Sequence, residues 1–244
     1  MTAPDSLDRF DRLDALRGVA IVWMAAFHFC FDLNHFRFIR QNFYTDPFWT
    51  WQRACIVSLF LFCAGLGQAV ALQQGQGRPR FGSRFWRRWA QVAACAVAVS
   101  VGSWFMFPNS FISFGVLHGI AVMLIVTRLT ARWGRWLWLA GAVAVLLPHL
   151  IQSPFFDSRW TNWVGFVTHK PVTEDYAPLL PWLGVMWWGV AAGQWLLLQR
   201  PQVLAGGVPQ WLHPLAVLGR WSLSFYMLHQ LLLIGALMAV AAWR

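Results

Sequence analysis

The sequence predicts an all-α membrane protein, a polytopic bundle of about seven transmembrane helices. Of its 244 residues, 58% are hydrophobic and only 11% are charged, whereas soluble domains carry about 25% charged residues. The hydrophobic residues form continuous runs close to the ~20 residues that a helix needs to cross a bilayer. The net charge of +10 comes from arginines grouped between these runs, a pattern typical of loops at a membrane surface.

Seven runs qualify as membrane-spanning helices. Because they are continuous rather than alternating between apolar and polar residues, they favour helices over the strands of a membrane barrel. The fourth and fifth runs are short and the seventh is long, so we expect tilt or a break near Gly219 in the last one. The predicted spans are residues 16–36, 55–72, 86–107, 114–129, 136–151, 180–198 and 215–243.

The distribution of arginines predicts the orientation. They concentrate before the first run and after the second, fourth and sixth runs, and the positive-inside rule places these segments in the cytoplasm. An odd number of spans then puts the amino terminus inside and the carboxyl terminus outside. No soluble domain or internal repeat is visible, so residues 1–244 are predicted to form a single transmembrane domain. The arginines assigned to the cytoplasmic side are Arg9, Arg12, Arg17, Arg78, Arg80, Arg84, Arg87, Arg88, Arg128, Arg132, Arg135, Arg200 and Arg220.

Several function classes gain no support from the sequence. Nucleic-acid binding requires a basic face or a known module, whereas these arginines lie in short clusters between apolar runs. The four cysteines have no C-x-x-C spacing, so we predict neither a metal site nor a disulfide framework. Motifs of phosphate-binding loops, zinc proteases and serine hydrolases are absent from the sequence.

The first run carries two ionisable residues that we predict to be catalytic. His28 lies about 16 Å along the helix axis from Arg17, close to the middle of the bilayer. Asp32 follows four residues later and shares its face of the helix. A histidine with a carboxylate in reach is typical of a general base. The structural alternative is a histidine hydrogen-bonded to a neighbouring helix.

Two further histidines are predicted at a similar depth. His118 lies near the outer end of the fourth run, and His229 lies about 14 Å into the seventh run from the cytoplasmic side. Either could relay protons or bind substrate, because ionisable residues within a membrane are expensive and usually functional. Either could equally be a packing partner of His28, and the sequence leaves these interpretations open.

Asp175 precedes the sixth run, where Pro178 and Pro181 suit the start of a helix. Its carboxylate fits an amino-terminal cap or a first-turn acid of that helix. Its expected position at the outer mouth of the bundle also leaves open a contact with a substrate.

The ordered set of these motifs resembles a known family. Residues 12–29 hold an Arg17-Gly18 pair followed by His28, which is similar to the first-helix signature of membrane acyltransferases. More specifically, the chain resembles the bacterial branch of the heparan-alpha-glucosaminide N-acetyltransferase catalytic-domain family. The related acyltransferase-3 proteins use a first-helix histidine, which matches His28. Four further stretches carry the resemblance, at residues 58–65, 114–118, 175–184 and 218–230.

The resemblance implies acyl transfer across a membrane. Acetyl-CoA in the cytoplasm would serve as donor, and a hydroxyl or amino group of an extracytoplasmic glycan would serve as acceptor. Arginines bind phosphate well, so Arg17 and Arg220 are the expected contacts of coenzyme A. His28 would either deprotonate the acceptor or carry the acyl group itself as a covalent intermediate, and the sequence leaves both open. The expected location is a bacterial inner membrane, with the lipid bilayer and the glycan as partners and neither a metal nor nucleic acid involved. Dimers occur in the wider family, so a homodimer is among the expected states.

Two other functions remain open at this stage. Intramembrane histidines and aspartates also serve proton-coupled transporters, although such proteins commonly show repeated halves. Alternatively, the chain is a non-catalytic subunit of an envelope assembly, in which the histidines only tie helices together. Binding of acetyl-CoA and labelling of a glycan would separate these functions from acyl transfer.

Overall fold

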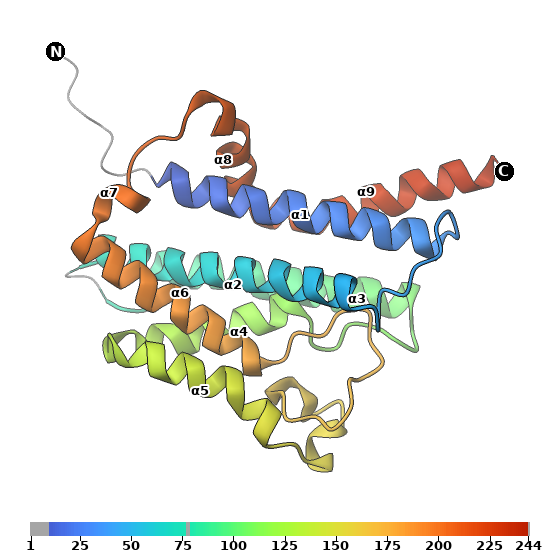
Figure 1. Ribbon diagram of the computed structural model, residues 1–244, viewed down its shortest axis with the longest axis horizontal. Helices are drawn as coiled ribbons and strands as arrows, with labels where there is room; N and C mark the ends of the chain where they lie inside the picture. The colour runs from blue at the N-terminus through green and yellow to red at the C-terminus, as the bar shows by residue number, and fades with distance from the viewer. Residues whose placement is uncertain (1–9, 77–78, 244) are drawn as a thin grey trace. The chain divides into compact units, whose positions relative to one another are not determined.

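The computed structural model describes residues 10–76 and 79–243, which form helices joined by loops and short 3-10 turns (Figure 1). No strand occurs in these two ranges, so the all-helical prediction is confirmed. Arg9 and Arg78, which contribute to the predicted orientation, lie outside the described residues. The helices are α1 (Asp11–His35), α2 (Pro47–Gln74), α3 (Ser83–Met106), α4 (Val116–Thr130), α5 (Trp136–Leu150), α6 (Leu179–Gln199), α7 (Pro201–Leu204), α8 (His213–Arg220) and α9 (Ser222–Ala242).

Five segments of the described chain are long and apolar enough to cross a membrane: α1, α2, α3, α4 with the turn that follows it, and α9. Helix α5 has 15 residues, which corresponds to about 22 Å and falls short of a typical hydrocarbon core. Helix α6 has a non-helical backbone at Leu180, with φ −103° and ψ 135°. A membrane protein is therefore supported, while the count of seven spans and the orientation stay predictions.

Large apolar side chains on α3 and α9 point away from the rest of the protein. Phe105 in α3 is 81% exposed, and Leu232 in α9 is 70% exposed. Exposed apolar surface on this scale is unfavourable in water but suits contact with lipid tails. The exposed faces of these two helices therefore agree with the membrane assignment.

Contacts within the chain define two compact units, and the boundary between them falls inside α2. The first unit comprises Met1–Phe60 and Arg200–Arg244, and the second comprises Leu61–Gln199. The prediction of one transmembrane domain stays a prediction.

In the first unit, α1 packs against α8 and α9 (Figure 1). Gly18 lies against the backbone of Leu215, and Gly219 lies against the backbone of Asp14. A side chain at either glycine would collide with backbone atoms, so these two glycines permit the close approach of α1 and α8. The long last run is broken at Trp221, between α8 and α9, which confirms the expected break near Gly219.

An aromatic cluster anchors the loop between α1 and α2 in the same unit. Phe43 is only 2% exposed and makes edge-to-face contacts with Phe27 and Phe31 of α1. Its ring also stacks on Trp49 at a centroid distance of 4.0 Å. Because this one side chain joins the loop to both neighbouring helices, it stabilises the far end of α1 beyond His28.

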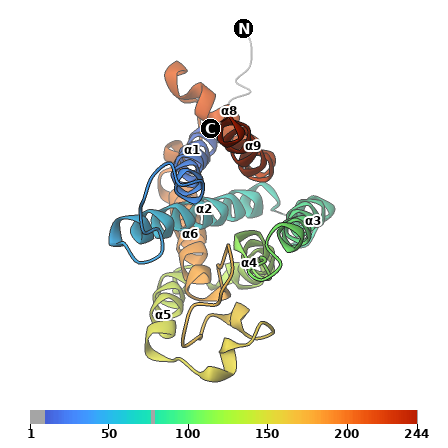
Figure 2. The same cartoon turned by 90° about the vertical axis from the view of Figure 1, so that its right-hand side faces the viewer.

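In the second unit, α3 packs against α4, and α6 packs against both α4 and α5 (Figure 2). Small residues again allow close approach, because Gly141 of α5 and Gly184 of α6 lie directly against each other's backbone. The indole of Trp188 in α6 donates a hydrogen bond of 3.0 Å to the carbonyl of Trp138 in α5. These contacts hold α5 and α6 together within the second unit.

Candidate functional site

His28 and His229 form a direct pair within the first unit. His28 Nδ1 lies 2.7 Å from His229 Nε2, and the two rings are nearly parallel, with an interplanar angle of 14°. His229 is buried in α9, while His28 in α1 is half-buried. The sequence left open whether His229 relays protons, binds substrate or packs against His28. The structure shows that it contacts His28 directly.

The hydrogen-bond network determines which nitrogen of each neutral ring carries the proton. His229 Nδ1 faces the carbonyl of Tyr226 at 2.8 Å and that of Phe225 at 3.2 Å, so it is the donor. His229 Nε2 therefore accepts the proton of His28 Nδ1–H. This arrangement leaves the lone pair of His28 on Nε2, which has no hydrogen-bond partner in the part of the chain that the structure describes.

Asp32 and Gln230 form a second pair between the same helices. The amide nitrogen Nε2 of Gln230 donates to both carboxylate oxygens of Asp32, at 2.8 Å and 3.1 Å. Asp32 is buried, and the amide oxygen of Gln230 is enclosed and has no hydrogen-bond partner among the described residues. The sequence predicted His28 as the partner of Asp32, whereas the structure places Gln230 against the carboxylate. The two pairs hold α1 and α9 together, at positions four residues apart in α1 and adjacent in α9.

Gln230 had no role in the sequence interpretation, although it follows His229 directly. The signal that could have found it is its polarity within an apolar span, since polar groups in a membrane need partners. Only the packing of α9 against α1 shows that its partner is Asp32.

Arg17 and Arg220 lie together near the amino-terminal end of α1, where both contact Asp14. Arg17 Nη1 donates to Asp14 Oδ1 at 2.9 Å. Arg220 Nη2 donates to Asp11 Oδ1 at 2.8 Å, and its Nε lies 3.7 Å from Asp14 Oδ2. Each arginine side chain remains about 30% exposed, so neither is fully buried by its ion pairs.

His118 lies in the second unit and uses both of its ring nitrogens. Its Nδ1 accepts a hydrogen bond of 3.3 Å from the backbone amide of Gly115, just before α4. The proton is therefore on Nε2, which lies 3.1 Å from Ser100 Oγ in α3. The serine hydroxyl in turn donates to the carbonyl of Ile112 at 2.6 Å. These contacts fasten the start of α4 to α3.

Asp175 caps the amino-terminal end of α4 rather than that of α6, the helix that follows it in the chain. Its Oδ2 accepts a hydrogen bond of 2.7 Å from the backbone amide of Val116, the first residue of α4. The sequence predicted a cap on the helix that follows Asp175 in the chain. The loop folds back instead, and the partial positive charge at the amino-terminal end of α4 attracts the carboxylate.

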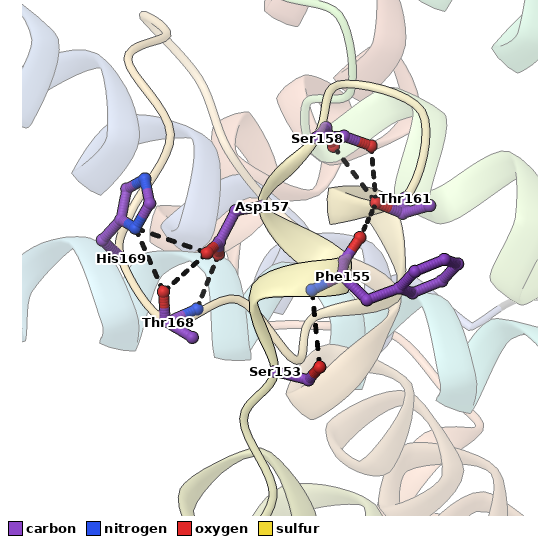
Figure 3. Close-up of polar contacts among 7 residues, drawn as sticks. All are labelled: Ser153, Phe155, Asp157, Ser158, Thr161, Thr168 and His169. Atoms are coloured by element: carbon purple, nitrogen blue, oxygen red, sulfur yellow. Dashed lines mark hydrogen bonds and ion pairs between the residues drawn. The ribbon is translucent and has the colours of Figure 1, made fainter.

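A polar cluster also orders the connection between α5 and α6 (Figure 3). Asp157 accepts hydrogen bonds from the hydroxyl and the amide of Thr168, at 2.6 Å and 2.8 Å. His169 lies 3.6 Å from the same carboxylate and is largely exposed. Chiefly because of the bond from the Thr168 hydroxyl, the pKa of Asp157 lies below its usual value. Every partner in this cluster belongs to the same connection. We therefore interpret the Asp157 cluster, formed by Asp157, Thr168 and His169, as contacts that stabilise the loop.

Among the described residues, no group of three or more His, Cys, Asp or Glu side chains is arranged to hold a metal ion. The expectation that the protein works without a metal stays a prediction. The site residues named from the sequence thus form two groups, each within one unit. Arg17, His28, Asp32, Arg220 and His229 lie in the first unit, whereas His118 and Asp175 lie in the second.

Comparison with protein families gives a match over most of the chain. The family model described as "Heparan-alpha-glucosaminide N-acetyltransferase, catalytic" matches residues 9–231, which is most of the chain. Comparison with curated proteins and with solved structures gives no match.

Proposed function

Because the chain belongs to the heparan-alpha-glucosaminide N-acetyltransferase catalytic family, we propose that it is a membrane acetyltransferase. In this proposal, an acetyl group passes from cytoplasmic acetyl-CoA to a hydroxyl or amino group of a glycan on the other side of the membrane. The observation that carries the proposal is the His28–His229 pair, which leaves a basic nitrogen on His28.

His28 Nε2 acts as the general base. Its lone pair takes the proton of the acceptor hydroxyl or amine as the acceptor attacks the thioester carbonyl. A carbon–oxygen or carbon–nitrogen bond forms, and the carbon–sulfur bond breaks as the tetrahedral intermediate collapses. The coenzyme A thiolate leaves and takes up the proton from His28, so the enzyme returns to its starting protonation state.

Two neighbours support this base. His229 accepts the Nδ1 proton of His28, which fixes the ring in the tautomer that exposes Nε2. Asp32 is one turn further along α1 and is the nearest carboxylate to His28 in the helix sequence. Its negative charge favours the imidazolium that forms during the reaction, and Gln230 orients its oxygens.

Arg17 and Arg220 are the proposed contacts of the donor phosphates. Arg17 lies eleven residues before His28 in α1, or about 16 Å along the axis. The pantetheine arm of coenzyme A extends roughly 15–20 Å, so a nucleotide at Arg17 could place its thioester at His28. Asp14 and Asp11 orient the two guanidinium groups, which lowers the entropy cost of binding a phosphate.

His118 and Asp175 are the proposed contacts on the acceptor side. His118 and Asp175 both hold the start of α4, and their contact with the acceptor stays a prediction. A bacterial inner membrane, a homodimer and a relationship to the acyltransferase-3 proteins belong to the same proposal. With the predicted seven spans, the acceptor chemistry would lie opposite the arginine-rich side.

The test is a His28→Ala variant in purified protein, assayed with radiolabelled acetyl-CoA and membranes that carry the native glycans. General-base catalysis contributes about 10²–10⁴-fold, so we expect transfer to fall by at least ~10²-fold while the protein stays folded. His149→Ala is the matched control, because His149 is an exposed histidine near the end of α5, in the second unit. Full activity of a folded His28→Ala variant would contradict the proposal. Failure of the wild-type protein to bind acetyl-CoA would favour a transporter or a non-catalytic subunit.

A further inference from the structure

Arg128, in the last turn of α4, is a buried cation whose hydrogen bonds are incomplete. Its side chain lies over the ring of Phe85, with Cζ 5.1 Å from the ring centroid. Its Nε donates to the backbone carbonyl of Arg80 at 3.0 Å. Its Nη1 is enclosed and finds no hydrogen-bond partner in residues 10–76 and 79–243. With only 8% of the residue exposed, water cannot replace the missing partner fully.

No carboxylate in the described part of the chain neutralises this group. The sequence contains no acidic residue between Asp46 and Asp157, although that stretch includes all of α3 and α4. Arg80 donates to another backbone carbonyl, that of Leu129, at 3.2 Å. Neither arginine has an ion pair within the described residues. The two side chains therefore link the loop before α3 to the end of α4, but their charges remain uncompensated.

The amino-terminal end of α3 adds to the positive charge at the same place. Phe85, on which Arg128 stacks, lies in the first turn of α3. That helix end has Gly82 as its cap and no side-chain cap hydrogen bond. Free backbone amides and the helix dipole favour an anion there. Instead, the start of α3 carries the exposed side chains of Arg84 and, one residue beyond the first turn, Arg87. Positive side chains are unfavourable at a helix amino terminus.

We propose that Arg80, Arg128 and the amino-terminal end of α3 bind the phosphate group of an anionic membrane lipid. Exposed indoles surround these helix ends, with Trp86 in α3, Trp133 directly after α4 and Trp136 at the start of α5. Tryptophan in such positions marks the level of the lipid headgroups. Basic pockets between transmembrane helices on the cytoplasmic side bind anionic headgroups. A headgroup phosphate at this helix end would supply the counter-charge that the Arg128 guanidinium lacks among the described residues.

The test is native mass spectrometry of the full chain in nanodiscs of phosphatidylcholine and phosphatidylglycerol in equal parts. We expect the wild-type protein to retain phosphatidylglycerol over phosphatidylcholine. Arg128→Gln and Arg80→Gln should each reduce this preference about fivefold, the effect of ~1 kcal/mol per arginine at a membrane surface. Arg200→Gln is the matched control, because it removes the same charge from an exposed arginine on the same predicted side and should keep the preference.

Circular dichroism shows whether each variant is folded. If Arg128→Gln does not fold, the lipid preference of Arg80→Gln tests the proposal. Unchanged retention of phosphatidylglycerol in folded Arg80→Gln protein would overturn the proposal. A second arm adds coenzyme A or inorganic phosphate to the wild-type protein. Displacement of phosphatidylglycerol by either one at equal concentration would also overturn it, because the site would then bind a soluble phosphate ligand. Neither arm depends on acetyl transfer, so the result is independent of the proposed function.

Discussion

Helices α1 and α4 each carry a histidine that looks equally functional in the sequence, yet the structure gives the two residues different roles. His118 in α4 accepts from the Gly115 amide through one nitrogen and contacts Ser100 through the other. His28 in α1 donates to His229 through one nitrogen, and its other nitrogen has no hydrogen-bond partner among the described residues. A free nitrogen, rather than the presence of a histidine in a membrane span, distinguishes a candidate base from a structural contact.

The arginines of the same two helices differ in a similar way. Arg17 in α1 pairs with Asp14, whereas Arg128 in α4 bonds to a backbone carbonyl and has an unsatisfied nitrogen. Both residues contribute equally to the net charge of the protein. The contacts show that Arg17 belongs to a compensated network, while Arg128 lacks a counter-charge among the residues that the structure describes.

The largest effect that tests this comparison is expected at His229. His229→Leu removes the acceptor of the His28 Nδ1 proton, and losing such an orienting partner costs roughly 10–100-fold in activity. His229→Gln keeps an acceptor near the position of Nε2, so its kcat/KM should fall less. The measurement is kcat/KM for acetyl transfer, with thermal stability recorded for both variants. Equal losses in folded Leu and Gln variants would show that tautomer control is not the role of His229.

Gly219→Ala should separate the role of close packing from that of the polar pairs. A methyl group at Gly219 would collide with the carbonyl oxygen of Asp14, and overpacking typically costs about 1–3 kcal/mol. The free energy of unfolding in detergent, measured with a denaturant, reports the change. Gly235→Ala in α9 is the control, because nothing lies within 4 Å of its added methyl group. Equal stability of the two variants would rule out the tight α1–α8 contact.

Arg220→Gln tests whether a compensated arginine still binds the donor. Loss of one charge-assisted phosphate contact should raise the KM for acetyl-CoA roughly tenfold, with a smaller change in kcat. Arg200→Gln, at an exposed site before α7, should leave KM unchanged. If Arg220→Gln also leaves KM unchanged, the donor phosphates bind elsewhere, and the comparison with Arg128 would need revision.

The smallest effect is expected when the pH is lowered at the Asp157 cluster. Because hydrogen bonds from Thr168 lower the pKa of Asp157 in the folded protein, its contribution is complete above the ordinary carboxyl pKa of about 3.9. That contribution is lost as the pH falls through the lowered value. Hydrogen exchange at the Thr168 amide, corrected for intrinsic rates, should stay protected from neutral pH to about pH 5 and lose protection under more acidic conditions. In Asp157→Asn this pH dependence should disappear.

Much of the fold followed from local patterns. The runs that became α1, α2, α3 and α9 are long and apolar, and hydrophobic length alone identifies them. The weaker predictions concern α5 and α6, where short length and a non-helical Leu180 interrupt the pattern. The family was predictable because its motifs occur in order along the chain, and residues 9–231 match it.

The sequence by itself determined that helices in a membrane form this protein and that His28, Asp32 and His229 carry ionisable groups into it. These properties depend on hydrophobic length and residue type, which are local. Only the tertiary structure decided that His28 pairs with His229, Asp32 with Gln230, and Asp175 with the start of α4. Such pairs join residues as far as 201 positions apart, and their partners depend on which helix faces pack together.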